Sequence, residues 1–158
     1  MVAALVSCSA TLTPAEIRRV QRFERYLQAA KAGDTEAQMY VAKSYRRGLN
    51  VAQNLQEAEM WYRRLAGQGN ISAQLELIRM YDSNGEFANE NPSECVRLAT
   101  QLYENPKASY EAKESAAFTL TLCHSKGYGV EKSPEKALEW KAKGKDAHLK
   151  YLKYEKKN

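Results

Sequence analysis

The side chains that could carry chemistry are few and widely spaced. The chain has three cysteines, Cys8, Cys95 and Cys123, and two histidines, His124 and His148. This spacing matches neither a zinc site nor a small disulfide framework, so we expect no metal and no cofactor. Cys123 and His124 are adjacent, and on a helix their side chains would diverge by about 100°, which excludes a nucleophile–base pair between them.

Other sequence motifs for catalysis are also missing. The sequence has no phosphate-binding loop of the G-x-x-x-x-G-K-[ST] type and no dinucleotide-binding glycine motif between a strand and a helix. We therefore predict that the protein is not an enzyme. We expect His124 to be a buried structural residue. Cys95 and Cys123 either act as small apolar core residues or pair in an oxidising compartment.

Cys8 differs from the other cysteines because it ends an apolar N-terminal stretch. Residues 1–7 are too few to span a bilayer, which takes about 20 residues. Leu5-Val6-Ser7-Cys8 resembles a bacterial lipobox, in which the cysteine is lipidated, but no basic segment precedes it. Two interpretations stay open. Residues 1–12 are the signal remnant or tether of a periplasm-facing lipoprotein in the bacterial cell envelope, or the match is chance and the protein is cytoplasmic.

The positive charge is concentrated at the C-terminal end. The chain has 24 basic and 19 acidic residues, which give a formal net charge of +5. Residues 141–158 contain seven lysines and two acidic residues, and the rest of the chain is balanced. Such a run is typical of a solvated helix end. The alternative is a tail that binds a polyanion, such as nucleic acid or an anionic lipid surface.

The elements that position these residues are predicted to be helices that recur along the chain. Good helix formers are plentiful, and the sequence has only 8 glycines and 4 prolines. Seven residues recur at an offset of 79: Ala37, Val41, Tyr45, Gly48, Val51, Ala58 and Trp61 match Ala116, Leu120, His124, Gly127, Val130, Ala137 and Trp140. A weaker copy begins at Ala73 and continues through Leu77 and Tyr81.

Each copy is predicted to form two helices. The first carries an apolar residue every four positions and ends at a glycine, Gly48 or Gly127. The second begins at a polar N-cap, for which the candidates are Asn54, Asn91 and Ser133. Glu57 and Glu94 are placed to complete capping boxes at the first two of these caps.

These patterns predict an all-α fold, a right-handed α-solenoid of antiparallel helix pairs. The helical repeat domain is expected over residues 13–143, with a lone helix at 14–32 and repeats at 37–72, 73–115 and 116–143. Residues 144–158 are expected to form a basic C-terminal helix extension.

The pattern A-x-x-x-[LV]-x-x-x-Y-x-x-G-x-[GN]-V, followed by A-x-x-W-Y, resembles the Sel1-like repeat, a relative of the tetratricopeptide repeat. Residues 37–72 and 116–141 match it, except that His124 replaces the tyrosine and Lys141 the second aromatic residue. Residues 73–115 match poorly after Tyr81. The resemblance implies a tetratricopeptide-like helical scaffold that binds other proteins, and some bacterial members are lipoproteins.

In such a solenoid the first helices of the repeats are expected to line a concave groove. Positions beside the buried stripe of each first helix then combine apolar anchors with cations, which suits a peptide with apolar and acidic side chains. They are Met39, Lys43, Arg46, Arg47, Leu75, Arg79, Phe118, Leu122 and Lys126. The alternative is that the apolar members pack between neighbouring helices.

The predicted function is therefore that of a scaffold or adaptor, which presents this groove to another protein. With Cys8 lipidated, the scaffold would work in a bacterial envelope or secretion assembly. Nucleic acid is not the expected partner, and we expect a monomer or a weak dimer. Polyanion binding through the lysine-rich tail is the alternative function.

Overall fold

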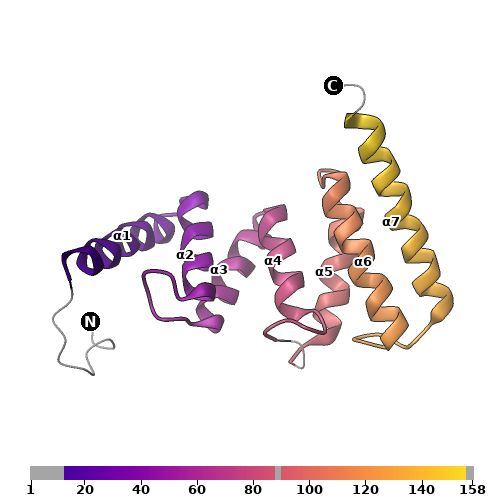
Figure 1. Cartoon of the computed structure of the whole chain (residues 1–158), viewed down its shortest axis with the longest axis horizontal. Coiled ribbons are helices and arrows are strands. Elements are labelled where there is room, and N and C mark those ends of the chain that lie inside the picture. Colours follow the sequence, from indigo (N-terminus) through magenta and orange to yellow (C-terminus); the bar gives the residue numbers. More distant parts are fainter. Residues whose placement is uncertain (1–12, 88–89, 156–158) are drawn as a thin grey trace. The chain divides into compact units, whose positions relative to one another are not determined.

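A computed structural model describes residues 13–87 and 90–155, and within these ranges the chain forms seven α-helices and no strand. The helices are α1 (Pro14–Lys31), α2 (Thr35–Arg47), α3 (Leu55–Gly67), α4 (Ile71–Tyr81), α5 (Pro92–Glu104), α6 (Tyr110–Lys126) and α7 (Pro134–Glu155), as labelled in Figure 1. The predicted all-α fold is confirmed. The right-handed twist of the repeats stays a prediction.

Polar residues cap the first turns of the helices, at Asn91 as the sequence predicts and also at Thr13. The Thr13 hydroxyl accepts a hydrogen bond from the Glu16 amide, and the Glu16 carboxylate accepts one from the Thr13 amide at 2.7 Å, so α1 begins with a complete capping box. Asn91 caps α5 by accepting from the Glu94 amide at 3.3 Å. The capping box predicted there is wrong, because the Glu94 carboxylate binds Arg97 at 2.6 Å instead.

Glycines end two of the first helices because the backbone there turns left-handed. Gly48 after α2 has φ of 66°, and Gly127 after α6 has φ of 75°. A residue with a Cβ atom is strained in this region, whereas glycine is not. The amide of Gly127 still donates to the Cys123 carbonyl, so the last turn of α6 is closed.

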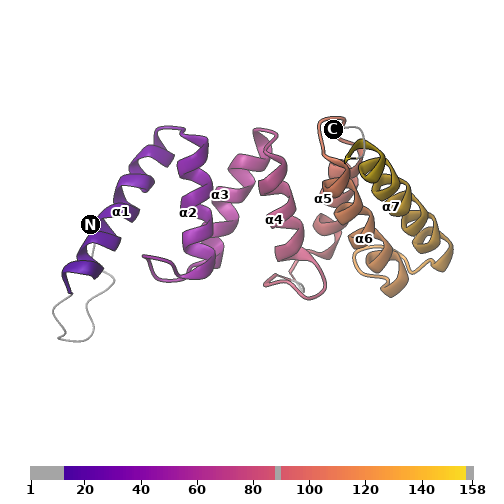
Figure 2. The same cartoon turned by 45° about the horizontal axis from the view of Figure 1, so that its top comes forward.

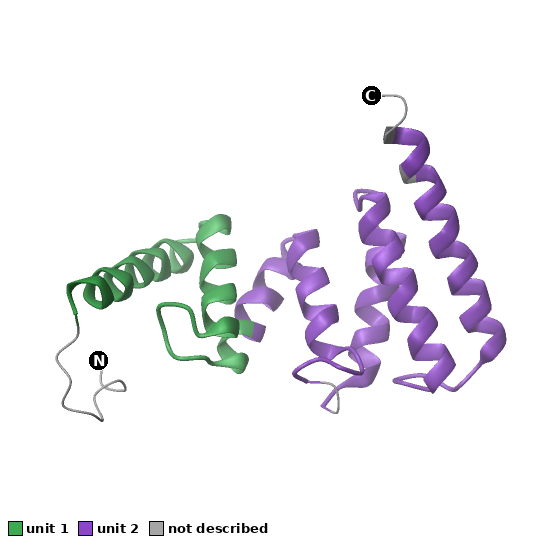
Figure 3. Cartoon of the chain, in the orientation of Figure 1, with its two compact units in different colours: residues 1–58 green, residues 59–158 purple. Residues whose placement is uncertain are grey.

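The chain divides into two compact units, residues 1–58 and 59–158, which Figure 3 colours separately. In unit 1, α1 packs against α2. The buried Phe23 ring meets the Tyr45 ring edge-on, with centroids 5.3 Å apart. The buried Gln38 amide donates to the Ala30 carbonyl at 3.1 Å, which satisfies a carbonyl in the last turns of α1.

In unit 2, α6 is the central helix and packs against α4, α5 and α7. The helices α5, α6 and α7 lie side by side in both views (Figures 1 and 2). Leu77, Leu102 and Leu120 are fully buried and come from α4, α5 and α6 in turn. Each such side chain contributes about 2 kcal/mol of hydrophobic stabilisation, so this apolar stripe supplies much of the stability of unit 2.

A polar network joins α3, α4 and α5 within unit 2. Arg63 donates from Nη2 to the Tyr81 hydroxyl at 2.7 Å and pairs with Glu59 at 2.7 Å and with Glu94 at 3.2 Å. The Tyr81 hydroxyl also hydrogen-bonds to Glu59. Burial and this bond to Glu59 raise the pKa of Tyr81 to about 12. The tyrosine position of the weaker repeat is therefore both a core position and a polar link between helices.

The last helix continues without a break through the boundary at residue 144. Gly144 is buried against α6, where a Cβ atom would lie 3.3 Å from Cβ of Ala117. One turn later Ala147 is also buried. Small residues therefore let α7 approach α6 closely, and residues 144–147 pack with the rest of unit 2.

Candidate protein-binding groove

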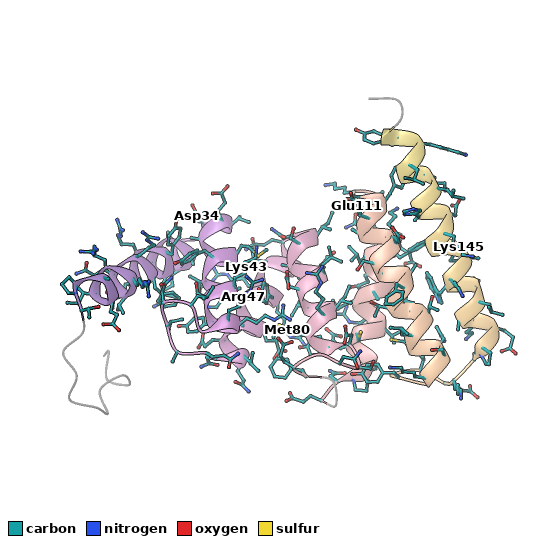
Figure 4. The ribbon with its side chains drawn as sticks, in the orientation of Figure 1. Asp34, Lys43, Arg47, Met80, Glu111 and Lys145 are labelled. Atoms are coloured by element: carbon teal, nitrogen blue, oxygen red, sulfur yellow. The ribbon has the colours of Figure 1, made fainter. Side chains whose placement is uncertain are left out.

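Of the predicted groove residues, four lie on α2 in unit 1. Lys43 and Arg47 are exposed and stand one turn apart, as labelled in Figure 4, whereas Met39 and Arg46 are half-buried. The Arg46 carbonyl accepts a hydrogen bond of 2.8 Å from the Gln53 side chain. None of the four is buried, so α2 offers two exposed cations and a partly exposed methionine.

The other five predicted residues lie in unit 2. Leu75 on α4 and Leu122 on α6 are half-buried. Arg79 is exposed and pairs with Glu76 at 3.1 Å, and Lys126 donates to the Ser83 hydroxyl at 3.3 Å. Phe118 is the most exposed of the apolar residues in the set, at 64%. Whether these residues bind a partner stays a prediction.

Phe118 lies in a groove that α6 and α7 form between them. This α6–α7 groove has a volume of about 800 Å³. Its lining consists of Glu111, Glu114, Ser115, Phe118 and Thr121 from α6 and of Trp140, Lys141, Gly144, Lys145, His148 and Leu149 from α7. Leu149 is 55% exposed, so the groove presents two large apolar side chains to solvent. Solvent-exposed apolar surface of this kind often marks an interaction site.

The walls of the groove are held by contacts behind and across it. The Trp140 ring stands at 85° to the Tyr103 ring of α5, with centroids 5.2 Å apart, and Lys143 Nζ lies 4.2 Å from the Trp140 ring centre. On the opposite side, His148 Nδ1 lies 3.1 Å from a carboxylate oxygen of Glu114. These contacts connect α5, α6 and α7, so the groove is formed before any partner binds.

The two walls differ in charge. Glu111 and Glu114 lie on the α6 side, and Lys141 and Lys145 lie on the α7 side; Figure 4 labels Glu111 and Lys145. Lys141 and Lys145 are exposed and make no ion pair with any residue in the described ranges, whereas Lys143 pairs with Glu139 at 2.7 Å. The α7 wall therefore has cations that are available to a partner.

The remaining chemistry-bearing residues are buried in the structural core. Cys95 and Cys123 are buried free thiols, and the hydrogen bond with Cys123, together with burial, raises the pKa of the Cys95 thiol. Burial, helped by Lys136, lowers the pKa of His124. The described residues contain no group of three or more His, Cys, Asp or Glu side chains arranged to hold a metal.

Phe118 was predicted from its spacing as a groove residue, whereas the residues of α7 on the opposite wall were not predicted. Trp140 recurs at the repeat position of the buried Trp61, yet it is only half-buried and lines the groove. The spacing of Trp140, Gly144 and His148 at four-residue intervals is the signal that could have placed them on one helix face. Which face α6 leaves open depends on the packing of α7, and periodicity alone does not contain that information.

The proposed lipidation site, Cys8, lies outside the described residues, as does the predicted signal remnant or tether at 1–12. None of the helices in residues 13–87 and 90–155 combines the length and the hydrophobicity that a membrane span requires.

Comparison with known proteins identifies the repeat. The family model of the Sel1 repeat matches residues 35–70 and 115–144. No curated protein sequence shows significant similarity to this chain. Among solved structures, a Sel1 repeat protein from Oxalobacter formigenes aligns with a TM-score of 0.63 and 23% identity over 81% of this chain and 50% of that protein.

A second solved structure is a protective antigen of uropathogenic Escherichia coli strains with an SLR fold. It aligns with a TM-score of 0.43 and 22% identity over 78% of this chain and 33% of that protein. The chain thus spans about half the length of the Oxalobacter protein and a third of the antigen. Sel1 repeats generally mediate protein–protein interactions, and proteins built from them are typically non-enzymatic scaffolds. With two Sel1 repeats and an all-α helical-repeat fold of the solenoid class, this chain belongs to the Sel1-like repeat family.

Proposed function

We propose that this protein is a non-enzymatic scaffold that binds another protein through the α6–α7 groove. The observation that carries this proposal is Phe118, a large apolar side chain that is 64% exposed and lies in a groove of about 800 Å³. Exposed aromatic residues in a preformed hollow are the usual anchors of protein interfaces, because they bury much area at low entropic cost.

We further propose that the scaffold works in a bacterial envelope or secretion assembly, tethered through a lipidated Cys8. The support is the sequence Leu5-Val6-Ser7-Cys8, which precedes the capped start of α1 at Thr13. The intact mass of the protein from its native cell tests this directly, because a cut before Cys8 with added acyl chains gives a defined mass.

A photo-crosslinking amino acid in place of Phe118 tests the groove. The matched control places the same group at Leu138, which is 67% exposed on α7 but does not line the groove. We expect a specific adduct from position 118 and none from 138. The partner identified from that adduct, purified, should bind the unmodified protein and lose about tenfold or more in affinity to Phe118→Ala. Equal binding to both proteins would contradict the proposal.

Polyanion binding by the C-terminal lysines is the second candidate function. Lys153 is exposed and makes no ion pair with a described residue, whereas Lys150 pairs with Asp146 at 2.7 Å. Binding to nucleic acid or anionic vesicles would fall steeply with salt and would be lost in Lys150→Glu/Lys153→Glu. The same double variant should leave partner binding at Phe118 unchanged, so the two functions are separable.

A further inference from the structure

We infer that the α6–α7 groove receives an amphipathic α-helix of a partner protein, with acidic side chains beside its apolar stripe. This inference rests on the proposed function and names the kind of element that the groove binds. Three observations carry it: the way the chain itself fills the equivalent position one repeat earlier, the length of the groove, and the charge of its α7 wall.

The protein contains an internal example of this docking. The first and second helices of one repeat, α4 and α5, are both contacted by the first helix of the next repeat, α6. The groove between α6 and α7 is the equivalent position one repeat later, since Ala116 and Leu120 on α6 correspond in sequence to Ala73 and Leu77 on α4. Repeats of this kind bury their apolar faces only by stacking on a neighbour. A helix is therefore the element whose shape this position fits.

The length of the groove sets the length of the helix. On α6 its lining runs from Glu111 to Thr121, and on α7 from Trp140 to Leu149. Each run covers about three helical turns, or about 15 Å. A bound helix of this length presents apolar residues every three or four positions, which would contact Phe118 and Leu149.

The positive charge of the α7 wall favours binding of a partner protein over binding of a second copy of this chain. Lys141 and Lys145 line the groove without an ion pair to any described residue, so acidic side chains on the bound helix would gain direct pairs. The helix of this chain that stands outside the predicted repeats is α1, which carries the cations Arg18, Arg19, Arg22 and Arg25. Like charges would oppose the docking of α1 of a second molecule beside these lysines.

Synthetic helical peptides of 18 residues provide the probe. One has leucines at three- and four-residue spacing flanked by glutamates, a second has lysines in place of the glutamates, and a third has a central proline that breaks the helix. Binding is followed by Trp140 fluorescence in a Trp61→Phe background. Trp61 is buried and its indole nitrogen has no hydrogen-bond partner in the described structure, so phenylalanine loses no hydrogen bond there.

The glutamate peptide is expected to bind, with affinity reduced about tenfold or more by Phe118→Ala and by Lys141→Glu/Lys145→Glu. Leu138→Ala and Lys150→Glu/Lys153→Glu should leave it unchanged. Equal binding of the lysine or proline peptide, or no effect of either groove variant, would overturn the inference. So would a dimer in analytical ultracentrifugation that Phe118→Ala abolishes, because a second copy would then be the occupant.

The experiments distinguish failure of the helical binding mode from failure of the proposed scaffold function. A partner that crosslinks at position 118 while no glutamate peptide binds would overturn the helical mode and leave the protein-binding function standing. Peptide binding without any crosslinked partner would instead overturn the proposed cellular function.

Discussion

The Trp140 ring on α7 meets the Tyr103 ring on α5 almost perpendicularly, at 85° and with centroids 5.2 Å apart. Trp140 also lines the α6–α7 groove, so one of the groove walls is supported by a helix that does not itself line it. Edge-to-face aromatic pairs of this kind contribute about 1 kcal/mol beyond the area they bury. The shape of the groove therefore depends on α5 as well as on α6 and α7.

Replacing Tyr103 should loosen the groove wall. We expect Tyr103→Ala to destabilise the protein by about 1–2 kcal/mol and to shift Trp140 emission to longer wavelength in a Trp61→Phe background, because the indole gains solvent contact. Tyr103→Phe keeps the ring and should behave like the unmodified protein. An unchanged emission maximum in the alanine variant would show that Tyr103 does not support Trp140.

Stability should fall below about pH 6.5 because of His124. Burial lowers its pKa in the folded protein from the ordinary value of 6.5, so below that pH the unfolded chain binds a proton more readily than the folded one. Urea unfolding at pH 7.5 and 5.5 should show this loss. His124→Tyr, which restores the residue type of the corresponding positions Tyr45 and Tyr81, should remove it. If His124→Tyr lost as much stability at pH 5.5 as the unmodified protein, His124 would not be the cause. His148 is exposed, so His148→Gln serves as the control variant.

Gly129 should tolerate no side chain. It has φ of 71°, and a Cβ atom there would clash with the backbone carbonyl of Pro92 at the start of α5. Backbone strain and overlap together should cost about 3 kcal/mol in Gly129→Ala. Gly67→Ala is the matched control, because nothing lies within 4 Å of the added atom and the residue is helical. Thermal unfolding of the two variants measures the difference, and equal melting temperatures would refute the close contact.

The buried thiols should react only when the protein opens. Cys95 and Cys123 are 0% and 2% exposed, so a thiol reagent reaches them only after local or global unfolding. In a Cys8→Ser background, we expect no alkylation by iodoacetamide in native buffer and two modified thiols in denaturant, as measured by intact mass. Rapid alkylation in native buffer would show that the interface between α5 and α6 is open.

Much of the fold could be predicted because its signals are local. Thr13 with Glu16, Asn91 before Pro92, and the glycines at 48 and 127 act on the backbone within one helical turn, and the structure uses them as caps and helix ends. The side chain of Glu94 departed from its predicted role because two arginines compete for it: Arg97 on its own helix and Arg63 on α3. Local sequence contained the first arginine, but the second reaches Glu94 only through the fold.

For the candidate site, too, some features were predictable from the sequence and others only from the fold. Sequence by itself determined the helices and the repeat register, since these follow from spacing along a single helix. Only the tertiary structure decided that Phe118 faces Leu149 and Trp140 across a groove, and that Gly144 allows the two helices to approach. Packing between helices depends on the shapes of both surfaces at once, and one-dimensional periodicity records only which residues share a face.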